Sequence, residues 1–569
     1  MKSTPDTLGF HACIATTLYV TTLWLFTAIQ VARAASPIDT VTSTQRQQDL
    51  QLKSLQSQAL GTPDALTATP LPFANALKLP EESPCFVIRT VAWKGEDDFD
   101  WLERASAILG QCVGGEGLTI YRRWVAAQLM ASGYITTQVL IPAQDLSSGH
   151  LVVQLIPGRM GKIDQQPASL GWPGMAFPAA KGELLNVRDL DQALENVRRL
   201  PGQAATTLNL IPGAELGESD VIVQQPPQAR RVFGLLTVDN SGIDATGRHQ
   251  LGGVVAVDSP AGLYDQLLLT YSTDTDFNNH TRRSSAKSLA WNVPAGYALL
   301  SFSASEWTSK QALFKDLGGR SIAFSSRTRR VDAGLDYVVS RSNRSKNVLN
   351  ARLVNREDRA WVASTELQQL HRQITSYELG LTHRANLRFG KLTAQAGVRG
   401  SLPGLSKSPG ALYEQQDWNG RYHLFTAKAA FEIPFDLGAM RLGYRNALVY
   451  QYAPVPVPST EYMQIGGRYS VRGFDGNTTL AGPTGWTLRN ELSITAFSGS
   501  QAYAALDAGA VSPVGGQRQG RQPLIGAAVG LRGSVSRFGY DLALGMPIKS
   551  NDEMNTTTPT LDFSLSSRF

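Results

Sequence analysis

The sequence predicts two small α+β units in tandem, followed by a transmembrane antiparallel β-barrel of about 16 strands. Three observations predict this fold. The first residues have the features of an export signal, residues 85–229 run twice through a similar order of strands and helices, and residues 230–569 consist of short alternating segments. With 569 residues, 52 of them glycine, the chain is too long for one core and rich in turns.

Composition argues against several functions. The net charge of +6 includes no basic block, so nucleic acid is not expected as a partner. The histidines are isolated in the sequence and form no HExxH or paired-ligand spacing, so we expect no metal. Gly114-Gly115-Glu116-Gly117 lacks the lysine of a phosphate loop and is expected to form a turn. We therefore expect no cofactor and no enzymatic activity.

Residues 1–34 have the pattern of a secretory signal peptide. Lys2 is followed by an uncharged run from Ala12 to Ala32, and Ala32-Arg33-Ala34 supplies the small residues that a signal peptidase recognises. The alternative is an uncleaved membrane anchor, because the uncharged run is long enough to span a bilayer. The small residues and the polar segment behind them favour cleavage.

The next two segments are a polar helix and a linker. Residues 42–60 contain no glycine or proline and are rich in glutamine, which predicts a helix within residues 35–60. Its leucines are too sparse to form a core of their own. Residues 61–84 contain five prolines and are expected to be a linker.

Cysteine usage is consistent with export. Cys13 leaves with the signal, so Cys85 and Cys112 remain in the mature chain. In an oxidising compartment two cysteines most simply form one disulfide. Two free thiols are the main alternative, and a metal site is less favoured because no histidine is close in sequence.

Residues 85–158 and 159–229 are expected to be two related α+β domains. For the first we expect strands at 85–93, 135–141 and 150–156 and helices at 98–109 and 119–131. For the second we expect strands at 161–163, 206–211 and 220–224 and a helix at 187–199. The sequence Leu-Ile-Pro-Gly ends a strand in both, at 155–158 and at 210–213, which suggests a repeat. The alternative is chance recurrence of a common strand–turn motif.

From residue 230 to Phe569 the chain alternates between apolar and polar positions. At the end, Leu561, Phe563, Leu565 and Phe569 share one parity, opposite Asp562 and Arg568. One face would meet lipid and the other a wet lumen, as in an outer-membrane barrel. A soluble β-sandwich would also alternate. However, no linker divides the region, and its polar parity carries serine, threonine, aspartate and arginine in strand after strand.

One loop in the barrel region carries a distinctive motif. Gly466-Gly467-Arg468-Tyr469-Ser470 runs directly into Val471-Arg472-Gly473-Phe474, between a proline-rich stretch and Gly482-Pro483. An arginine beside glycine and an aromatic residue can fold back into a barrel lumen and pair with a carboxylate of the wall.

These residues resemble the Omp85 superfamily, and specifically the TpsB transporters of the haemolysin and filamentous-haemagglutinin secretion type (ShlB/FhaC/HecB-like). Val471, Arg472, Gly473 and Phe474 match the tip of that family's loop six, although other members often have tyrosine where Phe474 stands. Residues 503–509 match the strand motif whose aspartate, here Asp507, receives the loop-six arginine. Residues 185–196 resemble the helix of the second POTRA domain, and residues 239–248 the first barrel hairpin.

The resemblance implies the arrangement of the whole mature chain. Residues 35–60 would be a plug helix, residues 85–158 and 159–229 periplasmic POTRA domains 1 and 2, and residues 230–569 the outer-membrane barrel. Arg472 would pair with Asp507. Terminal Phe569 resembles a barrel-insertion signal, which implies insertion by the barrel assembly machinery. The protein would be a monomer surrounded by outer-membrane lipid.

The resemblance also implies a function, which is export of a large β-rich exoprotein in a two-partner system without ATP. The client could be a haemolysin, an adhesin or a contact-dependent toxin. An extended client can add a strand to an exposed sheet edge. We expect this edge at residues 135–141, with Ile135, Thr137, Val139 and Ile141 as candidate client-binding residues. The alternatives are an assembly factor for other outer-membrane proteins, a passive porin and a secreted β-sandwich adhesin.

Overall fold

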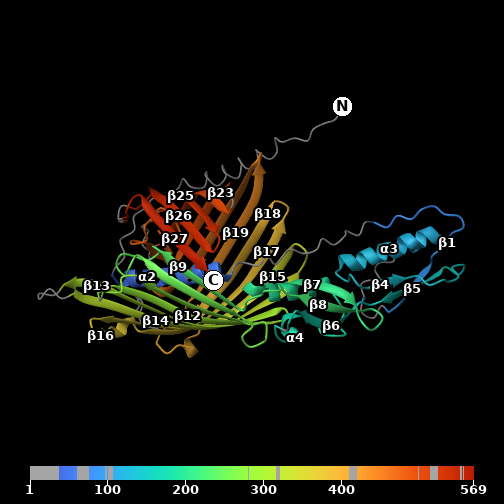
Figure 1. Cartoon of the computed structure of the whole chain (residues 1–569), viewed down its shortest axis with the longest axis horizontal. Helices are drawn as coiled ribbons and strands as arrows, with labels where there is room; N and C mark the ends of the chain where they lie inside the picture. Colours follow the sequence, from blue (N-terminus) through green and yellow to red (C-terminus); the bar gives the residue numbers. More distant parts are fainter. Residues whose placement is uncertain are drawn as a thin grey trace.

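The computed structural model describes most of the chain after the predicted signal (Figure 1). The described residues are 37–60, 76–95, 99, 107–168, 170–279, 281–315, 321–408, 419–497, 499–512, 523–551, 554 and 556–569. The predicted signal, most of the linker and most of the helix expected at 98–109 lie outside them. Within them, no helix is long and apolar enough to cross a membrane.

The C-terminal region is a closed barrel of sixteen antiparallel strands among the described residues, and the two-residue strand β16 (Thr365–Glu366) pairs with the end of β15. The strands are β9 (Val232–Asp239), β10 (Gln250–Asp258), β11 (Gln266–Asp274), β12 (Arg283–Ala295), β13 (Ala298–Lys315), β14 (Ser321–Arg341), β15 (Ser345–Val362), β17 (Arg372–Leu387), β18 (Gly390–Ser401), β19 (His423–Leu437), β20 (Met440–Tyr452), β23 (Thr484–Phe497), β24 (Ser500–Ser512), β25 (Leu524–Val535), β26 (Phe538–Lys549) and β27 (Thr560–Arg568). The predicted barrel and its strand number are confirmed.

The barrel closes where the last strand meets the first. β27 pairs with β9 over five residues, from Ser564 opposite Asp239 to Arg568 opposite Leu235. Phe569 extends this pairing, because its backbone N–H and C=O both bond to Gly234, at 3.0 and 2.9 Å. Gly234 also leaves room for the Phe569 ring, since a Cβ there would lie 2.1 Å from the ring. The C-terminal residue is thus part of the seam.

Among its described residues, the first α+β domain has one helix over a mixed sheet. Its elements are β1 (Phe86–Val87), β2 (Thr90–Lys94), β3 (Cys112–Val113), α3 (Gly115–Ala131), β4 (Gln138–Leu140) and β5 (His150–Ile156). The sheet order is β2-β5-β4, with β2 parallel and β4 antiparallel to β5. The apolar face of α3, including Tyr121, Val125 and Leu129, packs on Leu151 and Val153 of β5 in one buried core.

The second domain repeats this topology. Its elements are β6 (Arg159–Gln166), the one-turn helix α4 (Pro173–Ala176), α5 (Val187–Arg198), β7 (Thr207–Pro212) and β8 (Glu218–Gln224). The sheet order is β6-β8-β7, with β6 parallel and β7 antiparallel to β8. Helix α5 begins where the Asn186 side chain accepts a hydrogen bond from the Arg188 backbone N–H. The shared strand order argues that the two units are related repeats.

The second domain is docked on one end of the barrel. Glu195 of α5 bonds to Arg341 and Lys346 beside the β14–β15 turn, at 2.5 Å each. Tyr264, in the β10–β11 turn, is fully buried in the core of the domain. Burial raises the pKa of Glu195, but the two cations outweigh this effect and hold the pKa below its usual value. This contact identifies the barrel end that faces the two α+β domains.

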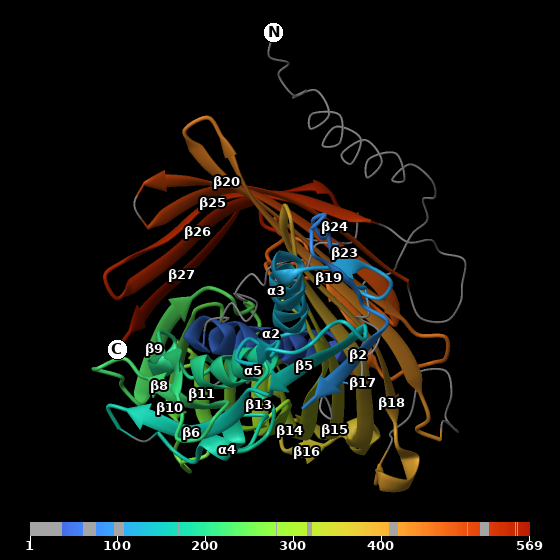
Figure 2. The same ribbon diagram turned by 90° about the vertical axis from the view of Figure 1, so that its right-hand side faces the viewer.

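Helix α2 (Pro37–Leu60) lies inside the ring of strands, as Figure 2 shows. Leu55 packs on Leu235, Val254 and Leu268 of β9, β10 and β11. Leu52 packs on Ala286 and Trp307 of β12 and β13. The two leucines, too sparse to form a core by themselves, are therefore buried against apolar side chains of the inner wall.

Candidate functional site

The loop between β20 and β23, which we call loop six, folds into the barrel. Its two ends pair as the short antiparallel strands β21 (Met463–Ile465) and β22 (Leu480–Gly482). Val471 and Phe474 at its tip are 0% and 1% exposed and pack in one cluster with Val511 and Leu524 of the wall. These apolar contacts hold the Val-Arg-Gly-Phe tip against β24 and β25.

Arg472 lies between these two apolar anchors and points at a pair of carboxylates. Its Nε and Nη2 donate to the two oxygens of Asp507 on β24, at 2.7 and 2.9 Å. Nη1 donates to Glu491 on β23, at 2.6 Å, and the Arg472 backbone N–H donates to Asp507 at 3.1 Å. A planar guanidinium suits such a fork of bonds, which lysine cannot reproduce. The structure thus brings together the two residues that the family resemblance paired.

Glycines allow the tip to touch the wall directly. Gly473 has φ +91°, and a Cβ there would lie 2.4 Å from the Met546 carbonyl oxygen of β26. A Cβ on Gly526 of β25 would lie 1.9 Å from the Arg472 carbonyl oxygen. Both positions exclude a side chain, one of them also because of its backbone conformation.

Arg468 of loop six lies at the barrel seam. It donates to the Asn240 side-chain oxygen at 3.3 Å and to the Phe563 carbonyl of β27 at 3.5 Å. The Asn240 side chain also bonds to the backbone of Leu561 and Phe563, at 2.6 and 2.9 Å. Asn240 therefore continues the β9–β27 pairing beyond the end of β9, and loop six contacts the same point.

The wall around the loop-six tip is strongly charged. A cavity of about 250 Å³ is lined by Arg472, Glu491, Arg489, Arg532, Asp541 and Asp562, among others. Loop six thus forms part of an aqueous lumen whose acids and bases face one another. No group of His, Cys, Asp and Glu within the described residues has an arrangement that could hold a metal ion.

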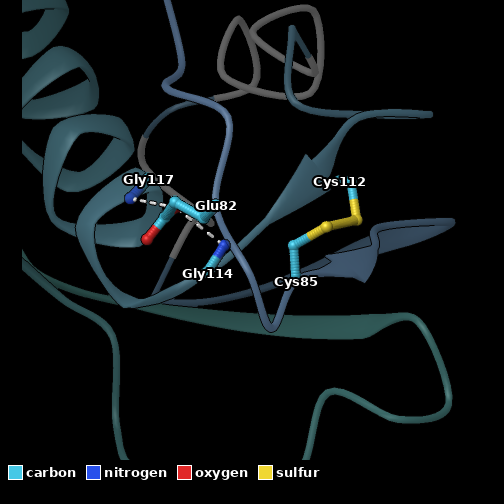
Figure 3. Close-up of a disulfide and its surroundings, with 5 residues drawn as sticks. All are labelled: Glu82, Cys85, Cys112, Gly114 and Gly117. Atoms are coloured by element: carbon cyan, nitrogen blue, oxygen red, sulfur yellow. Dashed lines mark hydrogen bonds between the residues drawn. A yellow bond between two sulfur atoms is a disulfide. The ribbon is translucent and has the colours of Figure 1, made fainter.

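The first α+β domain is fastened by two links at one end of α3, shown in Figure 3. Cys85 and Cys112 form a disulfide. Glu82 accepts hydrogen bonds from the backbone N–H groups of Gly114, Glu116 and Gly117, at 2.8–2.9 Å. Although desolvation raises the Glu82 pKa, these three donors outweigh it and hold the pKa below its usual value.

The Gly114-Gly115-Glu116-Gly117 segment does not remain a turn throughout, because α3 already begins at Gly115. Glu82 explains this start. A carboxylate at a helix N-terminus satisfies backbone N–H groups that lack partners within the helix. That carboxylate comes from the linker, more than thirty residues earlier in the chain.

The observed sheet edge at β4 differs from the predicted client-binding edge in its length and in the direction of its side chains. Strand β4 covers only Gln138–Leu140, and residues 135 and 136 form a turn before it. The four named side chains are all used internally: Val139 and Ile141 pack in the first domain's core, Ile135 packs against the second domain, and Thr137 accepts a bond from the Gly158 N–H. The side chains that face outward are Gln138 and Leu140, and Leu140 is 38% exposed.

Several residues of the site carry no signal in the sequence that would predict their contacts. Glu491 belongs to no motif. Only the register of β23 against β24 brings it near Asp507, because Glu491 lies opposite Ala505, two residues before Asp507. Asn240 and Arg468 stood within motifs that resemble the family, but no sequence signal indicated that they meet. Glu195 and its two cations likewise come from distant segments, 146 and 151 residues apart.

Comparison with known proteins agrees with this architecture. The family described as haemolysin secretion/activation protein ShlB/FhaC/HecB matches residues 217–533, a ShlB-type POTRA domain matches residues 86–158, and a second POTRA domain matches residues 162–212. The outer membrane transporter CdiB-2 of Burkholderia pseudomallei is 31% identical over 95% of both chains. The hemolysin transporter protein ShlB of Serratia marcescens is 26% identical over 73% of both.

Solved structures give the same result. CdiB from Escherichia coli superposes with a TM-score of 0.84 at 26% identity, covering 94% of this chain and all of the other. CdiB from Acinetobacter baumannii gives 0.79 at 26% identity, covering 95% of this chain and all of the other. The chain therefore belongs to the ShlB/FhaC/HecB family of the Omp85 superfamily, and it is an outer-membrane transporter of two-partner secretion systems with periplasmic POTRA domains.

Proposed function

We propose that this transporter exports one large β-rich exoprotein in an extended form, N-terminus first and without ATP. The barrel supports this proposal, because sixteen strands enclose an aqueous lumen wide enough for an extended chain. Folding of the client outside the cell would supply the direction. The curated relatives support it as well, since two of them are named hemolysin transporters.

The client is first recognised at the outer edge of β4 in POTRA domain 1. Within the described residues β4 ends the sheet β2-β5-β4, so its outer backbone groups are not used by another strand of that sheet. An extended client can bond to this backbone, which gives affinity. Because Ile135, Thr137, Val139 and Ile141 point inward, side-chain selectivity would come from Gln138, Leu140 and the neighbouring helix α3.

The transport path opens when α2 and loop six move. Among the described side chains, three hydrogen bonds join helix α2 to the barrel. Gln48 donates to the Thr308 carbonyl at 3.4 Å, Gln56 donates to Ser288 at 3.1 Å, and Arg568 of β27 donates to the Gln58 carbonyl at 3.2 Å. Loop six is held more firmly, through Arg472 and its two buried carboxylates. The observation that carries the proposal is that both segments lie within the barrel, held by the apolar, hydrogen-bond and ion-pair contacts described above.

A secretion assay tests the proposal. The chain is co-expressed with a candidate large exoprotein, and the exoprotein outside the cell is quantified at equal amounts of heat-modifiable barrel. We expect export with the wild type and its loss both in Arg472→Ala and on deletion of residues 85–158. No export by the wild type, together with defective assembly of other barrels when the gene is removed, would instead identify an assembly factor.

Client recognition needs a separate measurement. Leu140→Pro removes a backbone N–H from β4 and should weaken binding of an N-terminal client fragment to the purified transporter. Leu216→Pro is the matched control, because Leu216 is 83% exposed in the β7–β8 turn of POTRA domain 2. If deletion of residues 85–158 leaves client binding intact, the recognition site lies elsewhere.

A further inference from the structure

The outer wall of the barrel carries a lattice of charged side chains across β12, β13, β14 and β15. Directly paired positions form three rows. The rows are Lys287–Glu306–Arg329–Glu357, then Ser285–Thr308–Arg327–Arg359, then Arg283–Lys310–Ser325–Trp361. We call these twelve residues the basic lattice. It contains six cationic and two acidic side chains, a net charge of +4.

The side chains of the basic lattice face outward, and they lie on the extracellular side of a band of apolar side chains. The alternate positions point into the lumen, because Ser288 bonds to α2 and Trp307 packs on it. Among the described side chains of the same four strands, the large apolar ones with the greatest exposure lie between the basic lattice and the periplasmic turns. They are Leu289, Leu300, Phe302, Val331, Leu335, Tyr337, Val339, Leu349 and Leu353. The change from apolar to charged marks the height at which the outer leaflet's headgroups begin.

Ion pairs fix the positions of the cations without covering them. Glu306 bonds to Lys287 at 3.0 Å and to Arg329 at 2.7 Å, and Glu357 bonds to Arg359 at 2.6 Å. The two carboxylates are only 19% exposed, whereas Lys287, Arg329 and Arg359 are 65%, 56% and 41% exposed. Arg327 lies 5.8 Å from the ring centre of Trp361. The positive groups are thus placed toward the surroundings, as a binding site for anions requires.

An apolar depression of about 670 Å³ adjoins the first row of the basic lattice. The outward-facing residues of its floor are Leu236, Val255, Leu269, Leu289, Val331 and Phe569. Lys287, Glu306 and Arg329 form part of the same lining, so the charged rim and the apolar floor are continuous. The lining includes Gly253 and Ala304, whose small size leaves space between the larger side chains around them. This combination suits a molecule with an acyl chain and a phosphorylated headgroup.

We propose that the basic lattice and its depression bind lipopolysaccharide of the outer leaflet. Its phosphates would pair with the arginines of the basic lattice, because guanidinium groups bind phosphate through paired hydrogen bonds. One acyl chain would lie in the depression. The net charge and the height of the basic lattice favour this lipid over a zwitterionic phospholipid, and the apolar floor favours a lipid over free phosphate.

The test uses the full-length transporter, delipidated in neutral detergent and titrated with lipid A, with phosphatidylglycerol or with inorganic phosphate. Bound ligand is measured by native mass spectrometry. We expect lipid A to bind the wild type, and the triple variant R327Q/R329Q/R359Q to bind it at least tenfold more weakly. The matched control is R344Q/R388Q/R537Q, which removes three exposed arginines from periplasmic turns and should bind lipid A like the wild type.

Heat modifiability shows separately whether each variant is folded, so a loss of lipid A binding can be distinguished from misfolding. Equal binding of lipid A by the wild type and R327Q/R329Q/R359Q would overturn the proposal. Phosphatidylglycerol or phosphate binding as tightly as lipid A would also overturn it, since the site would then recognise only negative charge. Ala304→Trp fills the depression without changing any charge. It should weaken lipid A binding, and unchanged binding would exclude the acyl chain from the depression.

Discussion

Arg472 and Asp507 form a two-bond ion pair in which neither residue is more than 7% exposed. The arginine comes from loop six and the aspartate from β24, so the pair joins a long loop to the inner wall. Burying these charges costs free energy unless their bonds are complete. Glu491 completes them, and the three side chains are best treated as one network.

Arg472→Ala should destabilise the folded barrel by about 3–5 kcal/mol, because it removes the two-bond partner of buried Asp507 and leaves only Arg489, at 3.7 Å, as a nearby cation. Adding Asp507→Ala should recover part of this loss, since the poorly paired buried charge is then gone. The temperature at which the heat-modifiable band converts measures both effects. Arg445→Ala is the control: this half-exposed arginine lies 3.8 Å from the same Glu491 and should cost about 0–1 kcal/mol. Equal losses at the two arginines would contradict the network.

Gly473→Ala should displace the loop-six tip and reduce export, although it removes no polar group. The new Cβ would meet the Met546 carbonyl, and the left-handed backbone of Gly473 is unfavourable for alanine. Secreted exoprotein per unit of folded barrel is the measurement. Gly404→Ala serves as the control, because nothing lies within 4 Å of a Cβ at Gly404. Normal export by Gly473→Ala would show that the loop tolerates a shift.

Removing helix α2 should raise the conductance of the barrel in planar bilayers. The double variant Leu52→Asp/Leu55→Asp should have a similar effect, because it places charges against the apolar wall side chains that hold the helix. Ser57→Asp changes an exposed position of the same helix and should leave conductance as it is. If conductance is unchanged without residues 37–60, α2 does not block the path.

Reducing the Cys85–Cys112 disulfide should destabilise POTRA domain 1 by about 2–4 kcal/mol, as expected for a cross-link that closes a loop of this length. The cysteines are 27 residues apart in sequence. Protease sensitivity of the first domain, with and without reductant, gives the measurement. The heat-modifiable barrel should be unaffected, and Cys85→Ser/Cys112→Ser should make the domain insensitive to reductant. An unchanged digestion rate would contradict this expectation.

Glu82→Ala should expose the first turn of α3 to hydrogen exchange. The Glu82 pKa is lowered in the fold, so its stabilising effect is complete above the usual glutamate pKa of about 4.3 and is lost as the pH falls through the lowered value. The amides of Gly114, Glu116 and Gly117 should therefore lose protection, relative to their intrinsic exchange rate at the same pH, in Glu82→Ala at neutral pH and in the wild type only under acid conditions. Glu81→Ala is the control. Equal protection in Glu82→Ala and the wild type would exclude this cap.

Local patterns in the sequence account for the architecture. Alternation with period two, such as that from Leu561 to Phe569, is a property of neighbouring residues, and a barrel in lipid requires it in every strand. The polar helix at α2 and the two α+β units follow from periodicity and turn residues in the same way. The Arg472–Asp507 pairing, by contrast, came from resemblance to a family, because spacing in the chain cannot tell which carboxylate an arginine will reach.

Tertiary structure alone decided which side chains meet across the barrel and which face of β4 is exposed. Glu491 joins Arg472, Asn240 joins Arg468, and Glu195 joins Arg341 only because strand register and closure bring distant segments together. Period two predicts that Ile135, Thr137, Val139 and Ile141 share a face, but not that this face packs inward. The physical reason is that alternation is a local property, whereas register, closure and docking depend on contacts over the whole chain.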